Sequence, residues 1–169
     1  GSVLIALGRP ADAVKHLLQA ITLNRDYTYA HFNLGNAYMH MEQYENAKSS
    51  YENAIISNPN FADAHYNLGN ACIDVGDYEN AEKNYKSAIA INPNSAEAYY
   101  NLGTAQFQLG KLESAVESYQ NTIKLMPEYF EAYNSQSVAL KGLDRFSEAV
   151  AVLQTAVSLK PDYAEALKN

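Results

Sequence analysis

The 169-residue sequence has few basic side chains and no long apolar run, and both shortages exclude classes of partner or location. Lys and Arg number 12 against 19 Asp and Glu, so the formal net charge is −7. Nucleic acids and anionic membrane surfaces bind mainly through clustered basic side chains, so neither is expected as a partner. The longest apolar run near the N-terminus, Val3–Leu7, is too short to cross a bilayer and lacks the basic flank of a signal peptide.

Signals for catalysis, cofactors and metals are equally scarce. Cys72 is the single cysteine, so it cannot form an internal disulfide, and an intracellular, cytoplasmic location is expected. The repeat pattern places Cys72 in a buried core position. His31 and His65 lie 34 residues apart, which is repetition rather than metal-ligand spacing. Because no phosphate-binding glycine loop is present either, we expect no enzyme, no cofactor and no metal site.

What the sequence does have is a period of 34 residues. The pair Leu34-Gly35 returns as Leu68-Gly69 and Leu102-Gly103. The same step relates two further sets of positions, which are Ala47, Ala81, Ala115 and Ala149, and Pro59, Pro93, Pro127 and Pro161. A fixed period of this length is typical of stacked repeats, which offer an extended surface to a partner.

Each repeat is predicted to form two antiparallel helices. In the first complete repeat, apolar and small residues run over 29–41, and a second periodic stretch runs over 44–57. Pro59 ends the second helix because proline lacks an amide hydrogen and restricts the residue before it. Short breaks such as Gly76-Asp77 and Gly110-Lys111 separate the helices of a pair, and glycine suits a helix C-terminus.

These residues resemble the tetratricopeptide repeat (TPR) family. The pattern His31-x-x-Leu34-Gly35-x-x-Tyr38, followed by Ala47, Tyr51, Ala54 and Pro59, is similar to the family pattern, with His in the usual place of Trp. The resemblance implies an all-α, right-handed superhelical solenoid. It predicts one array over 1–169, with partial repeats at 1–27 and 164–169 around complete repeats at 28–61, 62–95, 96–129 and 130–163. We therefore expect a fragment of a longer array.

Three features depart from the family pattern. Gln106 and Thr122 are polar at positions that the other repeats fill with Tyr, Cys, Leu or Ala. In the fourth complete repeat, Gln136-Ser137 replaces the Leu-Gly pair, so we expect the helix packing there to depart most from the family pattern. Tyr51 and Tyr85, with six other tyrosines, are assigned to scaffold positions rather than to binding.

The first helix of each repeat is predicted to carry a second face away from its packing residues, because side chains three to four apart share a face. In the resembling family this face lines the concave surface. The candidate peptide-binding residues on it are Tyr29, Phe32, Asn33, Asn36, Asp63, Tyr66, Asn67, Asn70, Glu97, Tyr100, Asn101 and Thr104.

A row of asparagines has a mechanism for binding peptides. Each amide offers a donor and an acceptor, so it can pair with the backbone of an extended segment whatever its sequence. The row is similar to that in the repeats of protein O-linked N-acetylglucosamine transferases. The alternative is that the asparagines only cap or bridge neighbouring helices.

The charges on this face favour a neutral to basic ligand. The family's basic clamp for a peptide C-terminus needs Lys or Arg, and the face has none before Lys141. Asp63 and Glu97 could instead attract basic residues, although acids in a first helical turn also complement the helix dipole.

The sequence thus predicts a non-catalytic scaffold that binds a protein or an extended peptide in its concave groove. Two alternatives stay open. One is the substrate-recruiting arm of a larger enzyme such as a glycosyltransferase, and the other is a module that associates with copies of itself.

Overall fold

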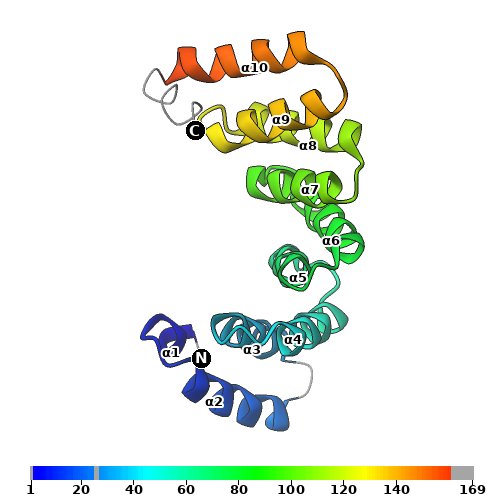
Figure 1. The fold of residues 1–169 in the computed structure, drawn as a ribbon. Helices are drawn as coiled ribbons and strands as arrows, with labels where there is room; N and C mark the ends of the chain where they lie inside the picture. Colours follow the sequence, from blue (N-terminus) through cyan, green and yellow to red (C-terminus); the bar gives the residue numbers. More distant parts are fainter. Residues whose placement is uncertain (1, 25–26, 161–169) are drawn as a thin grey trace. The chain divides into compact units, whose positions relative to one another are not determined.

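The computed structural model describes residues 2–24 and 27–160, and within them every regular element is an α-helix (Figure 1). The helices are α1 (Ser2–Ala6), α2 (Pro10–Leu23), α3 (Thr28–His40), α4 (Tyr44–Ser57), α5 (Ala62–Asp74), α6 (Tyr78–Ile91), α7 (Ala96–Gln108), α8 (Leu112–Leu125), α9 (Phe130–Gly142) and α10 (Phe146–Leu159). The prediction of an all-α fold built from repeated helix pairs is confirmed.

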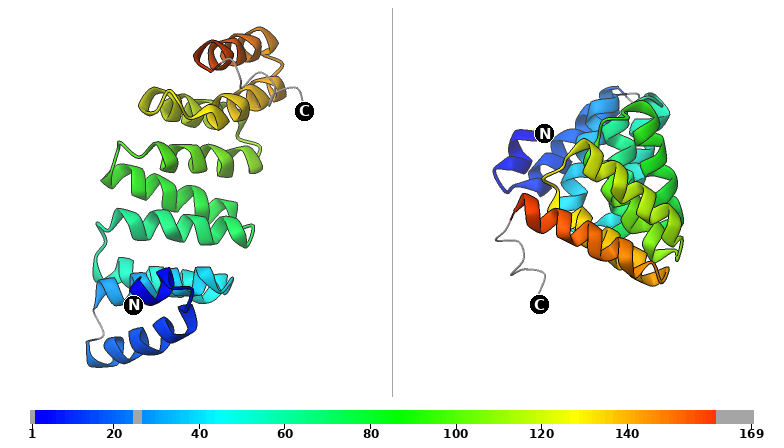
Figure 2. Two further views of the ribbon diagram at one scale, coloured as in Figure 1. Left: turned by 90° about the vertical axis from the view of Figure 1, so that its left-hand side faces the viewer. Right: turned by 90° about the horizontal axis from the view of Figure 1, so that it is seen from above.

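The chain divides into two compact units, Gly1–Pro93 and Asn94–Asn169. In the first unit, α3 packs on α4 and α5 packs on α6, while α2 contacts α3 and α4 contacts α5 (Figures 1 and 2). In the second unit, α7 packs on α8, and α9 packs on both α8 and α10. A single array over 1–169 with the repeat boundaries given above stays a prediction.

The turn inside each helix pair is closed by the same backbone hydrogen bond. The amide of Asp77 donates to the carbonyl of Cys72 (2.8 Å), and the amide of Gln43 donates to the carbonyl of Tyr38 (2.9 Å). This bond is typical of a helix end with a left-handed residue just after it. Gly76 supplies that residue at φ 77°, whereas Glu42 adopts φ 57° despite its side chain.

Small residues and the large rings of Tyr51 on α4, Tyr85 on α6 and Tyr119 on α8 make much of the core. Ala47, Ala54, Ala81 and Ala88 are at most 3 % exposed, which lets neighbouring helices approach closely. Cys72 is buried at 1 % exposure, so its prediction as a core thiol is confirmed. Burial raises the pKa of Cys72 to about 11, although the nearby Lys48 opposes the rise.

The polar departures in the third repeat, Gln106 and Thr122, each have a hydrogen-bond partner in the helix interface. Ser118 on α8 donates a hydrogen bond to Oε1 of Gln106 on α7 (2.7 Å), and both side chains are buried. The hydroxyl of Thr122, fully buried, lies 3.2 Å from the carbonyl of Ser118 and 3.3 Å from that of Ala96. Buried polar groups with partners avoid the desolvation penalty of unpaired ones, so these substitutions fit the helix interface.

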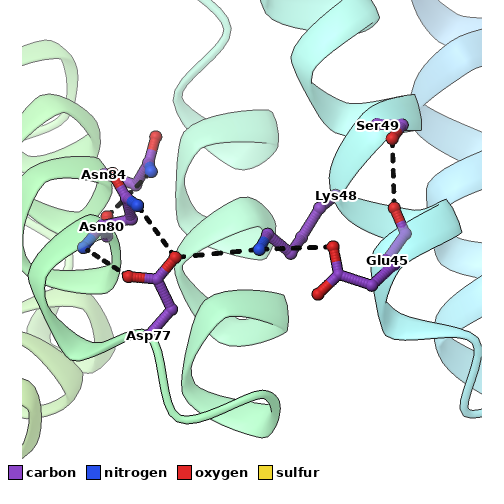
Figure 3. Close-up of polar contacts among 6 residues, drawn as sticks. All are labelled: Glu45, Lys48, Ser49, Asp77, Asn80 and Asn84. Carbon is purple, nitrogen blue, oxygen red and sulfur yellow. Dashed lines mark hydrogen bonds and ion pairs between the residues drawn. The ribbon is translucent and has the colours of Figure 1, made fainter.

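An ion pair joins α4 to the turn before α6. Lys48 Nζ lies 3.7 Å from Asp77 Oδ2 and 3.5 Å from Glu45 Oε2 (Figure 3). Asp77 also caps α6, because its carboxylate accepts from the backbone amide (3.3 Å) and from Nδ2 (2.8 Å) of Asn80. These bonds, chiefly those from Asn80, lower the pKa of Asp77.

Candidate functional site: an amide-lined pocket

A pocket of about 380 Å³ lies in the first unit, where three successive first helices of the repeats face the same side. We call it the amide pocket. It is lined by Ser2, Ile5 and Ala6 of α1, by Asn33, Asn36, Met39 and His40 of α3, by Tyr51 of α4, and by Asn67 and Asn70 of α5. The structure therefore brings four of the predicted site residues together, all of them asparagines. Among the residues that the structure describes, no Lys, Arg, Asp or Glu lines it.

The hydroxyl of Tyr51 reaches the pocket because the tyrosine ring packs directly against Gly35, which has no side chain. Tyr51 starts from α4, is 1 % exposed, and lays its ring directly on Gly35 of α3. A Cβ atom on Gly35 would lie 2.5 Å from the ring, so only glycine leaves room for this path. Beyond the glycine, the hydroxyl donates a 2.7 Å hydrogen bond to Oδ1 of Asn36. The sequence analysis assigns Tyr51 only to the scaffold, but the structure shows that Tyr51 also lines the pocket.

Asn36 also joins two consecutive first helices. Nδ2 of Asn67 on α5 donates to Oδ1 of Asn36 on α3 at 3.0 Å. Both lone pairs of the Asn36 carbonyl are thus engaged, one by Tyr51 and one by Asn67. Helix bridging and peptide binding, the two alternatives for the asparagine row, do not exclude each other at Asn36, because this residue bridges two helices and also lines the pocket. The sequence alone predicts that Asn36 offers both a donor and an acceptor to a ligand, but in the structure its acceptor is already used by Tyr51 and Asn67.

The next repeat builds the same arrangement. Tyr85 lays its ring on Gly69, where a Cβ atom would lie 2.6 Å away, and its hydroxyl donates to Oδ1 of Asn70 at 2.8 Å. Asn33, in contrast, turns back on its own helix, since its Nδ2 donates to the carbonyl of Tyr29 at 2.8 Å. The four asparagines therefore differ in which of their groups remain for a ligand.

The arrangement changes through the second unit. Tyr119 still lies on Gly103, but Thr104 takes the place of asparagine, and hydrogen bonds from Thr104 and Ser135 oppose the rise that burial causes in the pKa of Tyr119. One repeat later, Ser137, Val138 and Leu153 stand at the positions of glycine, asparagine and tyrosine. The glycine is lost together with the tyrosine that requires it.

Two predicted aromatics of the first unit, Tyr29 and Phe32, each pack on Phe61. Phe61, just before α5, contacts Phe32 at a ring-centroid distance of 4.8 Å and Tyr29 at 5.5 Å. Phe32 is half-buried and also contacts Tyr51 at 5.9 Å. Tyr29 is 63 % exposed, so it is the aromatic of this group with the most surface left for a ligand.

The remaining predicted residues do not line the amide pocket. Tyr66 packs on Tyr85 at 5.9 Å, and Asp63 is exposed in the first turn of α5. In the second unit, Tyr100 packs on Tyr129 at 4.9 Å, and Glu97 is exposed in the first turn of α7. Asn101 and Thr104 are half-buried on α7. The acids occupy helix N-termini, where the dipole explanation applies to each of them.

Neither a metal centre nor a membrane span emerges from the described ranges 2–24 and 27–160. No three His, Cys, Asp or Glu side chains gather there as metal ligands. No helix in these ranges is both long and apolar enough to cross a membrane.

Family models cover nearly the whole sequence. Models described as TPR repeat or tetratricopeptide repeat match residues 1–41 and 69–110, 28–61 and 96–129, 50–83, and 130–163. No curated protein matches the chain.

Solved structures with a similar fold include the MamA protein, which is 26 % identical with a TM-score of 0.91 over 98 % of this chain and 90 % of that one. YrrB, a TPR protein with an unusual peptide-binding site, is 23 % identical with a TM-score of 0.87, over 99 % of this chain and 86 % of YrrB.

A third similar structure is the first TPR of Spaghetti (RPAP3) bound to the HSP90 peptide SRMEEVD. It is 27 % identical with a TM-score of 0.67, over 69 % of this chain and 93 % of that one. With the matches to the family models and the paired helices described above, these likenesses lead to one conclusion: the chain belongs to the tetratricopeptide repeat family.

Proposed function

We propose that the chain is a protein-interaction scaffold whose amide pocket binds an extended peptide segment of a partner. The observation that carries this proposal is the pocket itself, with a volume of about 380 Å³, whose described lining has four asparagines, the hydroxyl of the buried Tyr51 and no Lys, Arg, Asp or Glu. Amides pair with the polar groups of a peptide backbone, and an uncharged lining does not require a charged ligand. Binding rather than catalysis fits such a lining.

One likeness supports the proposal, since a TPR structure 27 % identical to this chain holds a bound peptide. We further propose that the asparagine row acts as the similar row in the O-linked N-acetylglucosamine transferase repeats is expected to act, by pairing with peptide backbone. The acidic peptide in that TPR structure is not the expected ligand here, because the described residues that line the amide pocket include no Lys or Arg. We expect a neutral to basic segment with micromolar affinity, about −8 kcal/mol, since a flexible peptide is ordered on binding.

The test is a peptide array with neutral, basic and acidic sets of acetylated and amidated peptides. The pocket variant Asn33→Ala/Asn67→Ala should lose binding to the neutral and basic sets. The matched control Asn46→Ala/Asn53→Ala removes two exposed amides of α4 outside the amide pocket, and it should bind as the parent does. If no peptide binds the parent more tightly than about 1 mM, roughly −4 kcal/mol, the proposal is wrong.

The preference for basic ligands has its own test. Asp63→Lys combined with Glu97→Lys should move the array profile toward acidic peptides, because both changes reverse charge on the predicted binding face. An unchanged profile would mean that these acids serve only their helix ends, and the basic preference would then be dropped.

A second candidate function is self-association, which exposed apolar side chains on α10 favour. Phe146 is 57 % exposed, and Val150 and Leu159 are each 54 % exposed. Light scattering coupled to size-exclusion chromatography should show a concentration-dependent mass that Phe146→Glu/Val150→Glu abolishes. A constant monomer mass for the parent would exclude this candidate.

A further inference from the structure

We infer that Tyr51 polarises the amide pocket, so that Asn36 presents only hydrogen-bond donors and Asn67 presents an acceptor to the bound segment. The inference rests on the proposed peptide-binding function and makes it more specific. The ligand must then place a carbonyl against Asn36 and an N–H against Asn67. Tyr51 is a positioning residue in this arrangement, because it acts on the ligand through the two amides.

The donor role of Asn36 follows from what its carbonyl already does. Oδ1 of Asn36 accepts from the hydroxyl of Tyr51 at 2.7 Å and from Nδ2 of Asn67 at 3.0 Å. An amide oxygen has two lone pairs, so its acceptor capacity is used. Its Nδ2 carries two hydrogens and pairs with no other described residue. A ligand acceptor is therefore the complement that Asn36 can still take.

The acceptor role of Asn67 follows from the same contacts. Its Nδ2 faces Asn36, and a hydrogen bond from Asn67 opposes the rise that burial causes in the pKa of Tyr51. Only a donor has that effect on a phenol, so the nitrogen of Asn67 is directed at the pair Asn36 and Tyr51. Its Oδ1 has no partner among the described residues and is left for a ligand N–H.

Tyr51 can hold this pattern because its own position is fixed. Its ring is 1 % exposed, lies on Gly35 and packs against Phe32 at a centroid distance of 5.9 Å. The hydroxyl cannot swing away without moving the ring through the helix interface. Asn36 is thereby prevented from reversing its amide, since reversal would point its NH₂ at the donating Nδ2 of Asn67.

An extended peptide can pair with both the donor of Asn36 and the acceptor of Asn67, because its backbone presents carbonyl and N–H groups in alternation. One face of a single extended segment can offer a carbonyl to α3 and an N–H to α5. A ligand that carries only acceptors, such as a free carboxylate, would satisfy Asn36 but leave Asn67 unpaired. The pocket thus selects peptide backbone over a chain terminus.

The decisive variant is Asn36→Asp. Aspartate keeps the oxygen that accepts from Tyr51 and Asn67, so the helix bridge survives, but it replaces the donors by a second acceptor. The reference variant Asn33→Asp adds the same charge to the same pocket and leaves the Tyr51 bridge intact. With the tightest-binding neutral peptide of the array, Asn36→Asp should bind at least about tenfold more weakly than Asn33→Asp. Equal affinities of the two variants would overturn the donor role.

Tyr51→Phe tests the positioning role directly. It keeps the ring and removes the hydroxyl, so melting should change little, while the side-chain NH₂ resonances of Asn36 in ¹⁵N-labelled protein should shift and average toward solvent values. Peptide affinity should fall about three- to tenfold. Unchanged Asn36 resonances would show that Tyr51 does not hold the amide.

The two readouts separate the failures of the two proposals. If no peptide binds the parent, the proposed function fails, while the Asn36 resonances of the free protein still report on Tyr51. If a peptide binds the parent, but Asn36→Asp and Asn33→Asp weaken it equally, the function stands and the polarised pocket is wrong. A peptide with an ester in place of one amide tests the acceptor role of Asn67: if Asn67 accepts that N–H, Asn67→Ala should weaken binding of the amide peptide but bind the ester peptide as the parent does. Equal weakening of both peptides by Asn67→Ala would overturn the acceptor role.

Discussion

Replacing Gly69 by alanine tests the feature on which the pocket depends, the passage of a tyrosine ring across a glycine. An added Cβ atom would lie 2.6 Å from Cε1 and 2.8 Å from Cδ1 of Tyr85. Attractive carbon contacts lie at about 3.5–4.0 Å, so the ring must move by roughly 1 Å. Tyr85 is 1 % exposed and packs against Tyr66, so no open space receives it.

Three effects set the size of the loss. Overpacking a filled interface costs about 1–3 kcal/mol. Displacing the ring also weakens the 2.8 Å hydrogen bond from Tyr85 to Asn70, and the loss of this bond costs a further free energy of about 0.5–1.5 kcal/mol. Alanine in place of glycine inside a helix returns up to about 1 kcal/mol. We expect Gly69→Ala to be destabilised by about 1–3 kcal/mol.

Thermal and denaturant unfolding measure this loss, and each kcal/mol corresponds to a melting shift of about 2–4 °C at this chain length. Gly142→Ala is the matched control, because its added Cβ would meet only the end of the Leu112 side chain, at 2.8 Å, which can rotate away. It should change stability by less than about 0.5 kcal/mol. If Gly69→Ala melts within about a degree of the parent, the close passage of Tyr85 over Gly69 is wrong.

Three further predictions follow from burial and charge. Asp77→Asn should lower the free energy of unfolding by at most about 1 kcal/mol at pH 7. Because the pKa of Asp77 in the folded protein is lowered from 3.8, the stability that its carboxylate contributes is present above pH 3.8 and should vanish as the pH falls through the folded pKa. Urea unfolding of parent and variant as a function of pH measures this. Cys72, with its pKa raised to about 11, should react with iodoacetamide at pH 8 only as fast as the protein opens, and labelling at the rate of a free thiol would contradict its burial. Hydrogen exchange should be faster in α1, which has no buried residue, and in α10, which has two, than in α5, which has five; equal protection in all three would argue against end-to-centre loss of stability.

The period of the sequence determined most of the fold. The prolines after the second helix of each complete repeat and the glycines in some of the turns are local signals, each of which acts within a few residues of its own position, and the 34-residue period repeats them along the chain. They place the helix pairs, and the spacing of three to four residues places Asn33 and Asn36 on one face. The buried state of Cys72 follows from the same register.

The use of each amide was decided only by the tertiary structure. Tyr51 and Asn36 are 15 residues apart, and Asn67 and Asn36 are 31 apart, so their bonds depend on how two helix pairs stack. Helical spacing tells which face a side chain occupies but not which of its lone pairs another helix has taken. A signal was present all the same: where glycine and asparagine give way to Ser137 and Val138, the tyrosine gives way to Leu153. A tyrosine ring that lies directly on a helix needs the missing Cβ beneath it, and Tyr119, which still lies on Gly103 although Thr104 replaces the asparagine, follows the glycine rather than the asparagine.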